Sequence, residues 1–159
     1  VDGFTLNASL GYTDRKFKEF NVVNPKTGLE FNAADEAHFN YSASTTANAG
    51  IQYETEIANV GKLMARLDWT YRSRIYFHPL TIFNKYNDGM SDGAVGRFDA
   101  RIALSDIDLG PTRATVALWG KNITNKDYLY SGIDFGGLGF AGVVYAEPRT
   151  YGVDVKFAF

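Results

Sequence analysis

The sequence predicts an all-β fold, in the form of a segment of about six long antiparallel strands of a transmembrane β-barrel. Six stretches alternate apolar and polar residues, and no stretch shows a comparable helical period. Several of the stretches run to about 10 to 16 residues, which is longer than the 5 or 6 usual in globular sheets. The connections between them are alternately short and long. No apolar run approaches the length of about 20 residues that a membrane-spanning helix needs.

The alternating stretches give each predicted strand one apolar and one polar side. In the third stretch, for example, Leu67 and Trp69 lie opposite Arg66 and Asp68. In the fifth, Trp119 interrupts an otherwise polar side. The stretches cover approximately residues 4–13, 42–57, 62–77, 97–105, 113–121 and 151–159.

Two of the five connections are tight turns, "ANVG" (58–61) and "DLGP" (108–111), in which Gly and Pro favour a short reversal. The other three are long, at about residues 18–41, 78–93 and 125–149. Because short and long connections alternate, we expect both turns at one end of the sheet and all long loops at the other. Transmembrane barrels have this asymmetry.

Alternation alone does not identify the medium that the apolar side meets. A soluble sandwich or a soluble lipid-binding barrel would turn that side inward. Strand length favours the membrane, as do aromatic residues near the ends of the apolar stripes. Charges of both signs on the polar side favour a wide hydrated lumen, where each charge keeps water or finds a cross-strand partner. This predicted lumen charge ladder comprises Glu54, Glu56, Arg66, Asp68, Arg97, Asp99, Arg101, Asp154 and Lys156.

Composition gives no indication of nucleic-acid binding or catalysis. The net charge is -2, and cysteine is absent. Only two histidines occur, His38 and His78, with no local triad pattern, so we expect no enzyme, no cofactor and no metal. A calcium site in "NDGMSDG" is the less favoured interpretation, because Asn87, Asp88 and Asp92 lack the spacing of an EF-hand loop.

Two motifs near the end of the chain resemble those of TonB-dependent outer-membrane receptors. In "LWGKNITNKDYLY" (118–130), residues 122–125 and Tyr128 are similar to the Asn-Leu-Thr-Asp-like element and following Tyr of the penultimate strand. Ile123 and Asn125 replace the commoner Leu and Asp. In "EPRTYGVDVKFAF" (147–159), residues 148–152 match the Pro-Arg-x-Tyr-Gly element, and the chain closes on Phe159.

This resemblance implies a 22-stranded barrel in the outer membrane of a Gram-negative bacterium, preceded by a plug domain that binds TonB. Residues 1–159 would then be the C-terminal part of the barrel domain, completed by earlier strands and the plug of the same protein. The implied function is active uptake of a scarce siderophore-, vitamin- or saccharide-like ligand. Phe159 would belong to the signal read by the barrel assembly machinery. The alternative is a passive porin or structural outer-membrane barrel.

The resemblance also implies an orientation, with the C-terminal end of the chain at the periplasmic side and the long loops outside. Those loops would carry any ligand contacts that this segment contributes. Ordinary solvated loop residues are the alternative interpretation for each candidate. The candidates are His78, Asn84, Tyr86, Asn87 and Asp88 in one loop, and Tyr130, Asp134 and Phe135 in the next.

Overall fold

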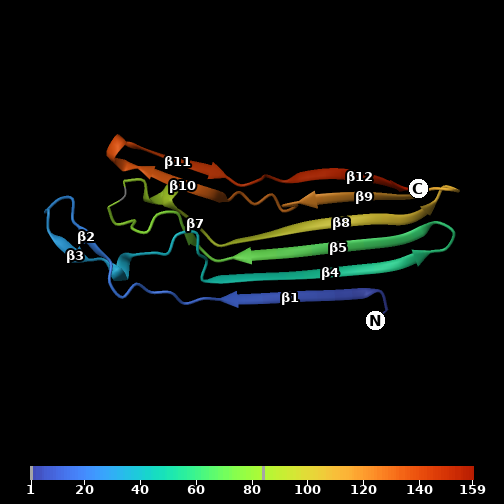
Figure 1. The fold of residues 1–159 in the computed structure, drawn as a ribbon, viewed down its shortest axis with the longest axis horizontal. Helices are drawn as coiled ribbons and strands as arrows, with labels where there is room; N and C mark the ends of the chain where they lie inside the picture. The colour runs from blue at the N-terminus through green and yellow to red at the C-terminus, as the bar shows by residue number, and fades with distance from the viewer. Residues whose placement is uncertain (1, 84) are drawn as a thin grey trace.

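The computed structural model describes residues 2–83 and 85–159 and is all-β. Six long strands form one sheet in which every neighbouring pair is antiparallel (Figure 1). The prediction of six long antiparallel strands is therefore confirmed. The sheet is open, because its first and last strands are edges. In spatial order the strands are β1 (Phe4–Tyr12), β4 (Thr45–Ile57), β5 (Gly61–Arg72), β8 (Val95–Asp108), β9 (Arg113–Lys121) and β12 (Thr150–Ala158).

Both tight turns lie at the end of the sheet that also holds the two termini, and the long connections lie at the other end (Figure 1). Asn59 in the first turn and Gly110 in the second have positive φ values of 62° and 83°. Those angles suit Asn and Gly better than other residues. The predicted separation of short and long connections is confirmed.

The strand register gives the sheet one apolar and one polar face. Residues directly opposite one another share a face, so the pairings can be followed from edge to edge. One row across all six strands consists of Phe4, Tyr53, Ala65, Ile102, Leu118 and Val153. The neighbouring row, on the other face, consists of Thr5, Gln52, Arg66, Arg101, Trp119 and Gly152.

Most of the buried apolar side chains lie outside this sheet. On the apolar face, Leu6 is 74% exposed, Leu118 57% and Val153 63%. Within the sheet, the buried apolar residues are the small Ala103, Ala114 and Ala117. Those in the long connections are Ala33, Ile75, Phe77, Leu80 and Met90.

The long connections are more ordered than the sequence suggested. The first contains β2 (Asn21–Val23), β3 (Glu30–Asn32) and a 3-10 turn, η1 (Ala34–Glu36). The second contains β6 (Ile75–Tyr76), η2 (Asn87–Met90) and β7 (Ser91–Asp92). No helix within the described residues is long and apolar enough to cross a membrane.

The third connection, predicted as a long loop at about 125–149, is instead largely a pair of strands. It forms a hairpin of β10 (Leu129–Phe135) and β11 (Phe140–Tyr145), joined by η3 (Gly136–Leu138). The glycines are concentrated at the reversal, where Gly139 has φ 82°. β-branched and aromatic residues on the two arms favour strands. Tyr130, Asp134 and Phe135 therefore lie on β10.

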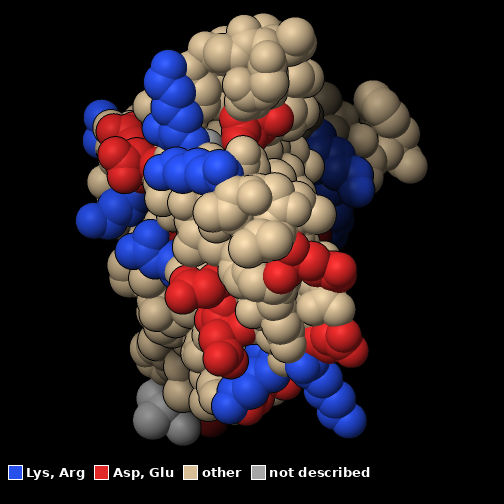
Figure 2. All heavy atoms as spheres, turned by 90° about the vertical axis from the view of Figure 1, so that its left-hand side faces the viewer, with Lys and Arg blue, Asp and Glu red and all other residues tan. Residues whose placement is uncertain are grey.

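The three long connections pack together, and we call residues 13–44, 73–94 and 122–149 the cap. The backbone N–H of His38 donates to the carbonyl of Pro79 at 2.8 Å, which joins the first connection to the second. Gly132 on β10 lies so close to Phe77 and Gly89 that a Cβ atom there would stand 2.7 Å from each. Figure 2 views the cap end-on, with acidic and basic side chains mixed among uncharged ones.

Candidate functional site

The polar face carries a network of charged side chains whose pairing follows from the register. Arg66 lies opposite Arg101, and Asp68 lies opposite Asp99. Like charges in direct opposition repel, so ion pairs form with other neighbours. Arg66 pairs with Asp68 on its own strand, with Nη2 and Oδ1 2.5 Å apart, and it also donates to Gln52 at 3.2 Å.

Arg101 forms its ion pair across β9. Its Nη1 atom donates to Oδ2 of Asp154 on β12 at 2.7 Å. Between them lies Trp119, whose indole Nε1–H donates to the other oxygen of Asp154 at 3.1 Å. Lys121 Nζ lies 5.9 Å from the centroid of the Trp119 ring. The surrounding hollow has a volume of about 590 Å³, and Arg66, Asp68 and Asp99 also line it.

The register places all nine predicted ladder residues on this polar face. Glu54 pairs with Lys62 at 2.5 Å, and Arg97 donates to the Tyr128 hydroxyl at 3.0 Å. Sequence reasoning left Lys62 and Arg72 out of the ladder. Both occupy the same alternate positions as Arg66 and Asp68, so the alternation itself could have identified them.

A buried asparagine connects two segments singled out in the sequence, residues 118–130 and 147–159. Asn122 is 2% exposed and has a left-handed backbone, with φ 48°. Its Nδ2 donates to the carbonyls of Lys126 at 2.9 Å and Glu147 at 3.3 Å, and its Oδ1 accepts the Lys126 N–H at 2.9 Å. Its own N–H donates to Asp99 at 2.8 Å. The segment after β9 is thus tied to both the polar face and the segment before β12.

Arg72, at the cap end of β5, connects the sheet to two cap segments. It forms an ion pair with Asp92, and the two side chains are 21% and 14% exposed. It also donates to the carbonyls of Gly93 at 3.1 Å and Leu129 at 3.4 Å. Its guanidinium lies 5.9 Å from the centroid of the Tyr128 ring. Asp92, one of the residues considered for calcium, is thus paired with Arg72. Among the described residues, no group of three or more His, Cys, Asp or Glu side chains could hold a metal ion.

The predicted ligand residues do not converge on one cavity. Asn87 and Asp88 line a hollow beside Arg74 and Tyr76. The remaining described candidates are dispersed. His78 Nδ1 lies 2.7 Å from the Leu80 carbonyl oxygen within a local turn, and Tyr86 donates its hydroxyl proton to the Gly139 carbonyl. Tyr130 is 71% exposed on β10, Asp134 and Phe135 lie near the hairpin tip, and Asn84 lies outside the described residues.

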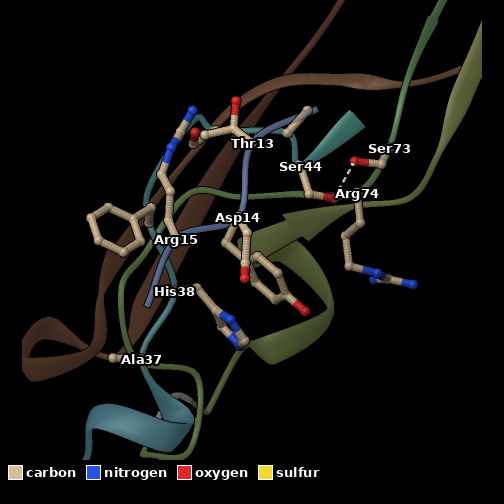
Figure 3. A pocket seen from close by; sticks show the side chains of 12 residues that line it. Thr13, Asp14, Arg15, Ala37, His38, Ser44, Ser73 and Arg74 are labelled. Carbon is tan, nitrogen blue, oxygen red and sulfur yellow. Dashed lines mark hydrogen bonds between the residues drawn. The ribbon is translucent and has the colours of Figure 1, made fainter. Parts of the chain in front are cut away.

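A third hollow, of about 260 Å³, went unpredicted because its lining comes from three segments that are separated in the sequence. Figure 3 shows Asp14 and His38 in it, with Arg15 and Arg74 at its sides and a hydrogen bond between Ser44 and Ser73. The His38 ring stacks on Tyr76 with centroids 3.5 Å apart. Burial lowers the pKa of His38 below its ordinary value of 6.5, against the opposing effect of the Glu36 carboxylate.

Phe159 follows directly after β12 and is fully exposed. Comparison with known proteins adds no assignment, since no protein-family model, curated protein or solved structure matches the chain.

Proposed function

We propose that this chain forms part of the barrel wall, extracellular loops and closing strand of a TonB-dependent outer-membrane receptor that takes up a scarce nutrient. The observation that carries the proposal is the apolar face, which runs unbroken across six strands and remains exposed. Covering one Val, Leu or Phe side chain is worth about 1.5 to 3 kcal/mol. A face of this extent is unfavourable in water, and lipid would cover it.

The opposite face suits a hydrated lumen. Its ion pairs are partly exposed, with the Arg101 and Asp154 side chains 39% and 51% accessible. Exposed pairs of this kind contribute little to stability, at most about 1 kcal/mol each. They do, however, line a wall along which a polar solute can pass.

The two terminal motifs support the family assignment within the proposal. They lie in separate segments of the chain, yet the Asn122 side chain connects them through the Glu147 carbonyl. The motif tyrosine, Tyr128, accepts a hydrogen bond from Arg97 on the polar face. Two of the residues that carry the resemblance, Asn122 and Tyr128, thus connect the segment after β9 to the segment before β12 and to the polar face.

The open edges fit a wall completed by other strands. β1 and β12 each have one side without a neighbour in the described sheet, and such edges bind further strands readily. In the proposed mechanism, a solute binds the outer loops and the plug, and force transmitted by TonB moves the plug. The solute then passes along the charged face. TonB, the plug, the earlier strands, lipid and the assembly machinery are the proposed partners.

Nitroxide labels at Leu67→Cys and Asp68→Cys test the orientation of the faces. These neighbouring residues point to opposite faces, so each is a control for the other. We expect the label at 67, in the whole protein in lipid, to collide with oxygen dissolved in the bilayer. The label at 68 should collide with a water-soluble nickel chelate. The reverse pattern would indicate a soluble barrel with its apolar face inward.

A second experiment separates active uptake from passive passage through a porin-like barrel. Cells are given a labelled candidate nutrient, and the inner-membrane proton gradient is then collapsed. Active uptake should stop although binding at the surface continues. Uptake that persists at an unchanged rate would favour the passive alternative.

A further inference from the structure

Among the described residues, Trp119 is the one aromatic side chain that the six long strands place on the polar face of the sheet. The register assigns every other aromatic residue of these strands to the apolar face. An indole among the charged side chains of this face calls for a specific explanation. The aromatic residues of the apolar face are Phe4, Tyr12, Tyr53, Trp69, Tyr71, Phe98, Tyr151 and Phe157.

The neighbouring strand leaves room for this indole. Gly152 stands directly opposite Trp119, and a Cβ atom on it would lie 2.2 Å from Cζ2 of the indole. The ring therefore occupies the space that any other residue at 152 would fill. A glycine within a strand often marks such a close approach.

Hydrogen bonding then fixes the edge of the ring. The indole N–H donates to Asp154, and Asp154 is itself held by Arg101 on β8. A ring fixed in this way loses little conformational freedom when a ligand stacks on it. The indole is only half-buried, and it borders the open hollow on the polar face.

The hollow also contains a cation with no carboxylate partner. Within residues 2–83 and 85–159, none of the four ion pairs uses Lys121. Its ammonium lies 5.9 Å from the indole centroid, close enough to meet an anionic group on a molecule stacked there.

We propose that Trp119 and Lys121 form a binding site for a flat ring that bears a carboxylate. The indole stacks against the ring, Lys121 pairs with the carboxylate, and Asp154 with Arg101 keeps the indole in place. The proposal depends on the local geometry of the polar face. It requires neither TonB nor lipid on the opposite face.

Fluorine NMR of the whole protein labelled with 5-fluorotryptophan tests the site, with the Trp119 signal identified by its loss in Trp119→Phe. The probes are benzoate, which is flat and anionic, cyclohexanecarboxylate, which is anionic but not flat, and benzamide, which is flat but neutral. We expect benzoate to shift the Trp119 signal saturably and to leave that of Trp69 in place. Each of the other two should bind about fivefold more weakly or worse, since each lacks one of the two interactions.

Two lysine variants distinguish benzoate binding at Lys121 from general electrostatic attraction to the polar face. Lys121→Gln should weaken benzoate binding by about threefold or more and leave benzamide unaffected. Lys156→Gln removes a charge from the same face but not from the hollow, and it should change benzoate binding little. The proposal is overturned if benzoate gives no saturable shift, if cyclohexanecarboxylate binds as well, or if both lysine variants act alike. None of these results would affect the nitroxide test of the two faces.

Discussion

The side-chain amide of Asn122 donates a hydrogen bond to the carbonyl oxygen of Glu147, 25 residues further along the chain. Asn122→Ala removes this bond and the two with Lys126, so the Glu147 carbonyl and the N–H and carbonyl of Lys126 lose the partner that Asn122 provides. We expect the free energy of unfolding in detergent micelles to fall by about 2 to 3 kcal/mol. Urea denaturation of the whole protein measures this change in the free energy of unfolding.

Two glycine variants provide the controls for Asn122. Asn122→Gly also loses the side-chain bonds but accepts the backbone angle of φ 48°, so it should cost about 1 kcal/mol less than Asn122→Ala. Asn125→Gly, at an exposed residue with φ 51°, should be nearly neutral. Equal losses for all three substitutions would show that the turn, and not the buried amide, provides the stability.

Gly152→Ala should disturb the packing of Trp119. The added Cβ atom would stand 2.2 Å from an indole that Asp154 holds in place, so the ring must move. We expect a loss of about 1 to 3 kcal/mol in the free energy of unfolding, measured by urea denaturation. The double variant Gly152→Ala with Trp119→Leu relieves the overlap, so the same glycine change should cost much less there. An equal cost in both backgrounds would contradict the prediction.

Arg72→Ala should loosen the cap while the long strands stay folded. The side chain connects β5 to Asp92, Gly93 and Leu129, and each of these bonds involves a charged donor. We expect amide hydrogen exchange at residues 73–94 and 122–149 to become about tenfold faster. Arg74→Ala, which removes a single bond to Ser91, is the matched control and should have little effect. Uniform acceleration across the sheet would indicate global destabilisation instead.

The first cap segment should lose stability as the pH falls. Burial depresses the pKa of His38, so the unfolded segment binds a proton more readily than the folded one. Its contribution to stability is fully present above the unfolded pKa of 6.5 and declines as the pH drops through 6.5 toward the depressed value. Amide exchange at residues 37–44 should therefore quicken below pH 6.5, after correction for the intrinsic rate. The same pH dependence in His38→Gln would exclude this histidine as the cause.

The long strands and their faces could be predicted from the sequence, because alternation at a period of two is a local pattern. Leu67 and Asp68 show it within two adjacent residues. The turns at Asn59 and Gly110 were predictable for the same reason, since turn chemistry is also local.

The interior of the cap could not be predicted in this way. The hydrogen bond from Arg72 to the Leu129 carbonyl and the stacking of His38 on Tyr76 join residues that are far apart in the chain. No periodic pattern in the sequence predicts such contacts. The β10–β11 hairpin was missed because glycines are frequent in loops, whereas here Gly136, Gly137 and Gly139 serve the reversal between two strands. The close fit of Trp119 to Gly152 becomes visible only once the register is known.

The location of the buried side chains has a practical consequence for handling the protein. Phe77, Leu80 and Met90 are buried within the cap, whereas most large apolar side chains of the six-stranded sheet are exposed. The two regions should therefore respond to different agents. A harsh detergent would first disrupt the six-stranded sheet, and a low concentration of urea would first unfold the cap. A preparation can thus lose its cap, with the short strands in it, while the six long strands keep most of the strand signal in circular dichroism.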